Sequence, residues 1–261
     1  MSVSAQRWKA QNYAAVGRFV ATLATGVVEL LDAQAGERIL DAGCGDGALT
    51  ERLAALGATV RGVDLSESMV EAARARGLTI DHRSLTELTY DGEFDAVFSN
   101  AALHWIPRES QPALLDGLFR ALRPGARLVA EMGGQGNIAA IRTALAAVLG
   151  RYGLDAEALA ASFYPSPQHY RALLEAAGFR VERMELVPRP TPLPNGSDGM
   201  RVWLETFRNG VLDLLPAADR AKALAEIVRL LRPVLFDSTG AEDAGWTADY
   251  MRLRFKAMRP E

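Results

Sequence analysis

Apolar and polar positions along the first half of this chain alternate between two periods. Five short, mainly apolar runs have the length and composition of buried strands, at residues 39–40, 59–63, 78–80, 94–100 and 127–132. Between them, apolar residues return every three or four positions, which predicts helices at 49–56, 66–76 and 110–122. Strands that alternate with helices in this way predict a mostly parallel sheet.

The second half of the chain contains more helix. The pattern predicts helices at about 137–150 and 167–177, and a sixth strand at 179–187. Prolines at alternate positions from 188 to 194, followed by Asn195-Gly196, predict a stiff linker. Helical periodicity then continues over 199–236, and residues 246–258 alternate as a last strand does. At the other end of the chain, residues 11–32 predict an amphipathic helix that begins close to Trp8 and Tyr13.

Composition narrows the classes of protein that these elements can form. A length of 261 residues with 49% apolar content suits one large α/β domain with an insertion. The net charge of −3 disfavours broad attraction to nucleic acid or to an anionic membrane. No apolar run reaches the roughly 20 residues that span a bilayer, and no signal peptide is recognisable, so we expect a cytoplasmic protein. The single cysteine, Cys44, excludes an internal disulfide framework, and no spacing suggests a metal site.

A glycine-rich turn follows the first predicted strand. Asp41 closes that strand, and Gly43, Gly45 and Gly47 alternate before the next helix. Glycines at this spacing let a ligand approach the backbone closely, and the amides at the start of a helix favour polar ligands. Asp64 ends the second strand, where it can accept hydrogen bonds from ribose hydroxyls. The stretch therefore predicts a nucleotide-binding βα unit.

Two nucleotide ligands fit this spacing. Gly43-x-Gly45-x-x-Ala48, with Asp64 about 20 residues further on, satisfies the dinucleotide fingerprint. However, a carboxylate at Asp41 would face the pyrophosphate of a dinucleotide, which is a repulsive contact between like charges. S-adenosylmethionine carries an ammonium and a sulfonium and no phosphate, so an acidic residue attracts it. A nicotinamide-dependent oxidoreductase and a tight turn with incidental glycines remain the alternatives.

Asp41-x-Gly43-x-Gly45-x-Gly47 followed by Asp64 resembles the first two motifs of class I S-adenosylmethionine-dependent methyltransferases. Leu122-Arg123-Pro124-Gly125-Ala126 before a strand resembles a further landmark of this class. The resemblance implies a Rossmann-like, mostly parallel seven-stranded sheet with an antiparallel last strand, helices on both faces and a helical cap inserted late in the chain. The implied domains are an N-terminal helix that closes over the cofactor, a core, the cap and the final strand of the core, at 1–33, 34–198, 199–240 and 241–261.

The same resemblance implies roles for residues of the cofactor site. Asp41 and the three glycines would hold the methionyl part, and Asp64 with Leu65 would hold the ribose side. The family usually places an acidic residue near the adenine amino group. Here Ser84 followed by Leu85 stands at the matching place, so a hydroxyl or backbone groups would make that contact.

Asn100-Ala101-Ala102-Leu103-His104-Trp105 follows the fourth strand, and ligands of open α/β sheets bind at the carboxyl ends of strands. Enzymes of this class that methylate nucleobases carry Asn or Asp before Pro-Pro and an aromatic residue. This segment instead resembles the small-molecule group that includes trans-aconitate methyltransferases, and Asn100 is expected to line the cofactor cleft.

The residues that follow are the candidates for chemistry. His104 is the candidate general base, with a hydrogen-bonded rim histidine as the alternative. Tyr13, Trp105 and Glu131 are candidate substrate contacts, with packing as the alternative for Trp105. A carboxylate acceptor would need no base but would need an arginine. Four arginines are available for that contact, namely Arg18, Arg108, Arg142 and Arg201.

The sequence thus predicts an enzyme that transfers a methyl group from S-adenosylmethionine to a small molecule by in-line displacement, releasing S-adenosylhomocysteine. The acceptor atom is an oxygen or a nitrogen, and a carboxylate oxygen is one option. A non-catalytic S-adenosylmethionine-binding module is the second alternative. Neither the acceptor nor the oligomeric state follows from the sequence.

Overall fold

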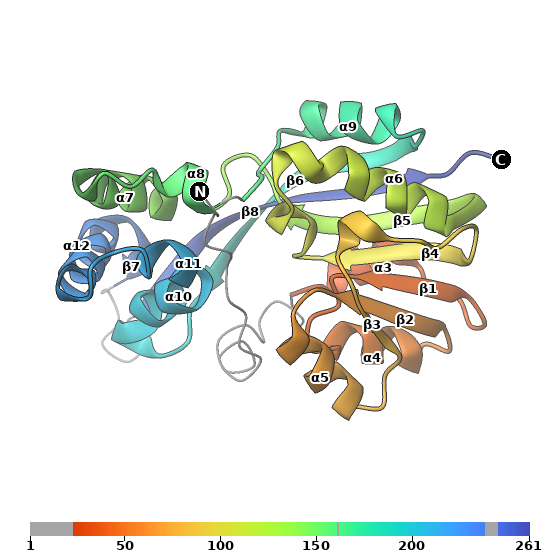
Figure 1. The fold of residues 1–261 in the computed structure, drawn as a ribbon, viewed down its shortest axis with the longest axis horizontal. Coiled ribbons are helices and arrows are strands. Elements are labelled where there is room, and N and C mark those ends of the chain that lie inside the picture. Colours follow the sequence, from red (N-terminus) through yellow and green to blue (C-terminus); the bar gives the residue numbers. More distant parts are fainter. Residues whose placement is uncertain (1–22, 161, 238–244) are drawn as a thin grey trace. The chain divides into compact units, whose positions relative to one another are not determined.

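The computed structural model describes residues 23–160, 162–237 and 245–261, which form two compact units (Figure 1). The core unit comprises the described residues up to Gln135, together with Phe163–Val187 and Arg252–Glu261. The helical unit comprises the described parts of Gly136–Ser162 and Pro188–Met251. Two strands cross the boundary, so each contributes residues to both units. Within these described stretches, no helix has both the length and the apolar content needed to cross a membrane.

The strands form one sheet in the order β3-β2-β1-β4-β5-β8-β6, with the short β7 paired to β8. Their bounds are β1 Arg38–Ala42, β2 Thr59–Asp64, β3 Ile80–His82, β4 Phe94–Asn100, β5 Leu122–Gly133, β6 Arg180–Pro192, β7 Phe236–Asp237 and β8 Gly245–Met258. The pairs β1–β2, β1–β4, β2–β3 and β4–β5 are parallel, whereas β5–β8 is antiparallel. This topology confirms the predicted Rossmann-like sheet with its antiparallel last strand, to which β7 adds two residues.

Successive strand residues point to opposite faces of the sheet. Because both faces of the core sheet are apolar, helices cover each of them. The core helices are α3 Thr25–Leu31, α4 Ala48–Ala55, α5 Glu67–Ala75, α6 Gln111–Ala121 and α9 Pro167–Ala176. In β1, Ile39 packs with side chains of α3 and α4. Its neighbour Leu40 packs on the opposite face, with side chains of α6 and α9. Two apolar clusters, one on each face, therefore hold the sheet edge where the glycine turn begins.

The helical unit contains more of the chain than the sequence predicts. Its helices are α7 Ala139–Leu149, α8 Ala156–Ala160, α10 Gly199–Phe207, α11 Asn209–Leu212 and α12 Ala217–Leu235. The predicted domains placed residues 136–162 in the core, yet α7 packs against α12 and α8 against α11. The Asp249 carboxylate accepts a 2.7 Å hydrogen bond from the Ala140 amide, which ties the start of α7 to β8. Sequence neighbours of β5 thus join this unit through contacts that are distant along the chain.

The predicted proline linker is instead part of a strand, because β6 continues to Pro192. Proline has no amide hydrogen, so it is tolerated in a sheet only where no ladder bond is needed. Pro188, Pro190 and Pro192 occupy alternate positions, which places all three missing N–H groups on one side of the strand. β6 is the last strand in the sheet order, and its outer side has no neighbour among the described residues.

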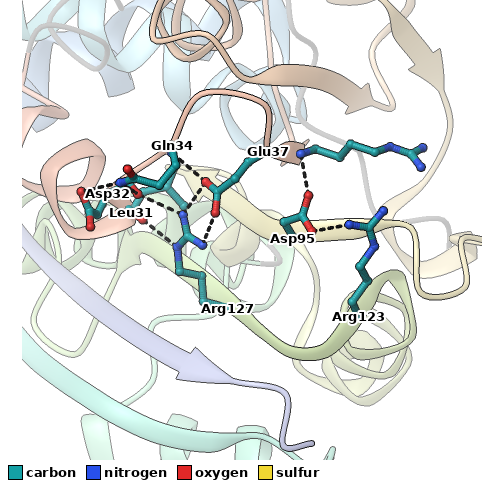
Figure 2. Close-up of polar contacts among 8 residues, drawn as sticks. Leu31, Asp32, Gln34, Glu37, Asp95, Arg123 and Arg127 are labelled. Carbon is teal, nitrogen blue, oxygen red and sulfur yellow. Dashed lines mark hydrogen bonds and ion pairs between the residues drawn. The ribbon is translucent and has the colours of Figure 1, made fainter.

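Ion pairs close the amino-terminal edge of the core sheet (Figure 2). Arg127 of β5 donates to both carboxylate oxygens of Glu37, each at 2.8 Å, and to the Leu31 carbonyl oxygen at 2.7 Å. Asp95, at the start of β4, accepts from the Arg123 side chain and, at 2.8 Å, from the first amide of β1. The Arg127 hydrogen bonds lower the pKa of Glu37. This edge is therefore built from carboxylates whose charges are satisfied within the chain.

The described residues also contain short 3₁₀ helices. They are η1 Leu85–Glu87, η2 Leu103–Trp105, η3 Arg108–Ser110, η4 Gly150–Tyr152 and η5 Gly196–Asp198. The first three lie in core-unit loops that follow the carboxyl ends of β3 and β4. Of the helix predicted at 11–32, the structure describes only α3, and Tyr13 lies outside the described residues.

Candidate functional site

The turn between β1 and α4 has a left-handed backbone at each of its three glycines. Gly43, Gly45 and Gly47 have φ values of +78°, +56° and +81°. A Cβ at Gly43 would lie 2.2 Å from the Ala102 Cβ, and one at Gly47 would lie 2.5 Å from a Leu78 methyl. A Cβ at Gly45 would meet no protein atom within 4 Å. The outer glycines are therefore required by packing, whereas Gly45 borders open space that a ligand can enter.

Asp64 links this turn to the end of β2. Its Oδ2 accepts from the Gly45 amide at 2.9 Å, and its Oδ1 accepts from the Ser66 amide at 2.8 Å. Burial raises the pKa of Asp64 although these amide bonds oppose the rise. Each carboxylate oxygen keeps a second lone pair that can accept from a hydroxyl. The adjacent Leu65 side chain is 66% exposed, an unusual position for a large apolar group and one that a flat ligand can cover.

Asp41 lies beneath the turn and is almost completely buried, with 2% of its surface exposed. Thr50 of α4 donates a 2.6 Å hydrogen bond to its Oδ2. Burial raises the pKa of Asp41 to about 7; the Thr50 bond opposes this rise and the Asp64 charge adds to it. The carboxyl is therefore only partly ionised at neutral pH. The repulsion expected from the sequence assumes a permanent charge, whereas burial leaves this carboxyl partly protonated in the folded protein.

The predicted adenine contacts have structural partners of their own. The Ser84 hydroxyl caps η1 by accepting from the Thr86 amide at 3.2 Å. The Leu85 side chain is buried in the core cluster beneath the glycine turn. Asp81, the acidic residue of β3, accepts from Arg61 at 3.2 Å and from the Tyr90 hydroxyl. The Ser84 hydroxyl and the Asp81 carboxylate are therefore both engaged within the chain.

The loop after β4 packs directly on the glycine turn. Ala102 is the residue that a Cβ at Gly43 would strike, so Ala102 lies directly against the turn. Ala101 has a φ of +57°, and its amide donates to the Glu131 carbonyl oxygen at 2.7 Å. Asn100 is paired with Glu131 in the β4–β5 register. Asn100 is the last residue of β4, as the sequence predicts. The contact between Ala102 and the glycine turn had no sequence signal.

His104 is buried, and its hydrogen bond defines its tautomer. The Gly133 amide donates to the His104 Nδ1 at 3.2 Å, so Nδ1 carries no proton and the ring proton is on Nε2. The ring lies 5.1 Å from the Trp105 ring and 5.6 Å from the Tyr164 ring. Tyr164, which precedes α9, was missed by the sequence analysis because no local pattern connects it to β4.

Glu131, a predicted substrate contact, is bound by a residue of the adjacent strand. Its carboxylate is 1% exposed and accepts from Arg254 Nε at 2.8 Å and Nη2 at 2.7 Å. Glu131 and Arg254 are directly opposite each other in the β5–β8 register. A substrate would have to compete with this buried ion pair for the carboxylate.

The residues around the glycine turn fit S-adenosylmethionine. Gly45 borders a space open to a ligand, Asp64 offers carboxylate lone pairs, and Leu65 presents an exposed apolar surface. In residues 23–160, 162–237 and 245–261, no group of three or more His, Cys, Asp or Glu side chains is arranged to hold a metal ion. Sheet order and turn together define an α/β protein of the nucleotide-binding kind, and the candidate site is the group of residues at the carboxyl ends of β1, β2 and β4.

Comparison with known proteins identifies the family. Residues 39–125 match the model of a methyltransferase domain. The chain is 34% identical to an uncharacterized methyltransferase of Schizosaccharomyces pombe, over 96% of this chain and 97% of that one. It is 32% identical to the trans-aconitate 2-methyltransferase of Deinococcus radiodurans, over 86% and 87% of the two chains. The chain therefore belongs to the S-adenosylmethionine-dependent methyltransferases, as its loop motifs predicted.

A solved structure gives the same fold at lower sequence identity. The phosphoethanolamine N-methyltransferase 2 of Haemonchus contortus, in complex with phosphomonomethylethanolamine and S-adenosylhomocysteine, superposes with a TM-score of 0.57 at 19% identity. The match covers 92% of this chain and 53% of that one. At this identity the similarity concerns the fold.

Proposed function

We propose that this enzyme methylates a small-molecule acceptor at a carboxylate oxygen. The observation that carries the proposal is the 3.2 Å hydrogen bond from the Gly133 amide to His104 Nδ1. A general base at His104 would have to accept a proton while its only unprotonated nitrogen already accepts this amide. Protonation would replace the hydrogen bond with two opposed donors in a buried site. His104 is thus suited to positioning the loop or donating through Nε2, and not to the predicted role of base.

A carboxylate acceptor removes the need for such a base. Carboxylic acids with ordinary pKa values are ionised at neutral pH, whereas an alcohol or an ammonium must lose a proton before it can attack. The full-length relative from Deinococcus radiodurans is named for a carboxylate-bearing substrate, trans-aconitate, which supports the same class. When bound, S-adenosylmethionine supplies a methyl group made electrophilic by the sulfonium.

The residues around the turn would hold the reactants in line. Gly43, Gly45 and Gly47 would let the methionyl part approach the backbone, while Asp64 would bind the ribose hydroxyls and Leu65 would cover an apolar face. Asp41 would be fully ionised beside the cationic cofactor. Holding two reactants aligned is worth up to about 7–11 kcal/mol in well-oriented intramolecular reactions.

The test is a methyl-transfer assay against paired acceptors. Each pair shares a carbon skeleton and differs in one group: trans-aconitate against its monoamides, and simple carboxylates against the corresponding alcohols and amines. We expect S-adenosylhomocysteine to form with the carboxylates, with a product that mild alkali hydrolyses as a methyl ester. The rate should vary little between pH 6 and 9. An alkali-stable methylamine or ether would contradict the proposal.

Binding measurements address the two alternatives. Calorimetry with S-adenosylmethionine and with NAD separates a methyltransferase from an oxidoreductase. A protein that binds S-adenosylmethionine but labels no acceptor in the panel would support a non-catalytic binding module.

A further inference from the structure

Three side chains of the core unit form a compact group beside the β4–α6 loop. Arg108 of η3 places its guanidinium carbon 5.6 Å from the centre of the Phe163 ring. The same guanidinium lies 3.2 Å, Nη2 to Nδ1, from His169 in the first turn of α9. The Phe163 and His169 rings meet edge to face, with centroids 5.5 Å apart. Two chain segments that are far apart in sequence therefore fix the position of one exposed arginine.

The charge of Arg108 is not neutralised by the part of the chain that the structure describes. Arg142 pairs with Glu157 at 2.9 Å, and Arg201 pairs with Glu205 at 3.0 Å, so these candidates for a carboxylate contact are already occupied. Arg18 lies outside the described residues. Arg108 has no ion pair with a described carboxylate, and the bond to His169 uses one of its five N–H groups. The remaining N–H groups of Arg108 can donate the bidentate pair of hydrogen bonds that a carboxylate accepts.

This group is connected to the loop that carries His104. The Phe163 amide donates to the His104 carbonyl oxygen at 2.9 Å, and the next residue, Tyr164, places its ring beside the His104 ring. Arg108 is also only four residues beyond His104 in the chain. An anion held by Arg108 would therefore be bound by the same segments that surround the candidate substrate loop.

We propose that Arg108, positioned by Phe163 and His169, binds a second carboxylate of the acceptor and so selects di- and tricarboxylic acids over monocarboxylic ones. This inference rests on the proposed function, because it assumes that a different carboxylate of the same molecule accepts the methyl group. Arginine suits the role because its planar fork matches carboxylate geometry, whereas a lysine would offer a single point charge.

The experiment compares wild-type enzyme with Arg108→Gln and Arg108→Lys. Each is assayed with trans-aconitate and with its diamides, which keep a single carboxylate, and calorimetry with trans-aconitate in the presence of S-adenosylhomocysteine measures binding independently of turnover. For Arg108→Gln we expect KM and Kd for trans-aconitate to rise roughly 10- to 100-fold, as the loss of a charge-assisted contact predicts. The preference for trans-aconitate over its best diamide should shrink accordingly, and Arg108→Lys should restore only part of it.

The control is Arg180→Gln, which removes an exposed arginine of the core unit that pairs with Glu182 on the surface. It should behave as wild type in every assay. Circular dichroism and thermal unfolding establish that the Arg108 variants are folded. Wild-type selectivity in both Arg108 variants would overturn this inference and leave the proposed function standing. If wild-type enzyme neither binds nor methylates any carboxylate, the proposed function fails and this inference fails with it.

Discussion

The carboxylates at the amino-terminal ends of the core strands and those at the carboxyl ends have different surroundings. At the amino-terminal edge, Glu37 and Asp95 are each bound by an arginine (Figure 2), and the pKa of Glu37 is lowered. At the carboxyl edge, Asp41 and Asp64 are bound by a hydroxyl and by backbone amides, and burial raises the pKa of both. The first arrangement completes the fold by itself. The second keeps one buried acid, Asp41, and one partly buried acid, Asp64, whose ionisation a cationic ligand would stabilise.

The contrast can be tested most severely at the glycine turn. Gly43→Ala should destabilise the protein by about 3 kcal/mol, because its Cβ would lie 2.2 Å from Ala102 on a left-handed backbone. Gly45→Ala should cost only about 1 kcal/mol of strain, since its Cβ meets no protein atom, yet it should weaken cofactor binding. Urea unfolding and calorimetry measure the two quantities. Equal stability losses would show that Gly45 does not border open space.

At the opposite edge, Arg127→Met should lower the free energy of unfolding by about 2–3 kcal/mol. The substitution keeps an unbranched apolar stem but leaves Glu37 without its partner in a pair whose side chains are only 15% and 18% exposed. We expect the Kd for S-adenosylmethionine to stay at its wild-type value. Glu93→Gln, which breaks an exposed pair with Arg38, is the control and should change stability by less than about 1 kcal/mol. A tenfold change in Kd for Arg127→Met would mean that the two edges are coupled.

Asp64→Ala should weaken S-adenosylmethionine binding by roughly 1–3 kcal/mol through lost charge-assisted hydrogen bonds. The Gly45 and Ser66 amides also lose their acceptor, so part of the effect arises from a looser turn. Asp95→Ala is the matched substitution at the other edge, where stability should fall and affinity should not. Calorimetry decides, and an unchanged affinity for Asp64→Ala would place the ribose elsewhere.

The smallest expected effect concerns pH. Because the pKa of Asp41 is about 7 in the folded protein and 3.8 as its ordinary value, the folded state binds the extra proton. The contribution of Asp41 to stability is therefore present at low pH and is lost as pH rises from about 4 to about 7. Asp41→Asn should remove this loss, so the variant gains on the order of 1–2 kcal/mol relative to wild type between pH 6 and pH 8.

Thermal unfolding of the ligand-free proteins at both pH values measures this difference. Saturating S-adenosylmethionine should reduce the pH dependence of the wild type, since a bound cation favours the ionised carboxylate. If the stabilities of wild type and Asp41→Asn change in parallel from pH 6 to pH 8, the carboxyl of Asp41 does not titrate in this pH range.

Local signals accounted for the strands, the turn and the class. The spacing of Gly43, Gly45 and Gly47 predicted the turn, and the apolar run before Asp64 predicted the end of β2. Both features depend on residues that are adjacent in the sequence. The prolines at 188–192 led to the wrong prediction of a linker, because an edge strand tolerates prolines that an inner strand does not. The sequence offered Arg108 only as one of four candidate arginines, and nothing in it connected Arg108 to Phe163 or His169, because these residues come from a distant segment of the chain.

The sequence alone determined the order of strands and helices, the residues that form the glycine turn and the methyltransferase family. Only the tertiary structure decided which carboxylates are paired, which nitrogen of His104 carries the proton, and that α7 and α8 pack with α12 and α11. These properties depend on atoms brought together from distant parts of the chain, and burial changes both the charge and the hydrogen-bonding role of a side chain. The periodicity of apolar residues along the sequence predicts neither the charge nor the hydrogen-bonding role of a buried side chain.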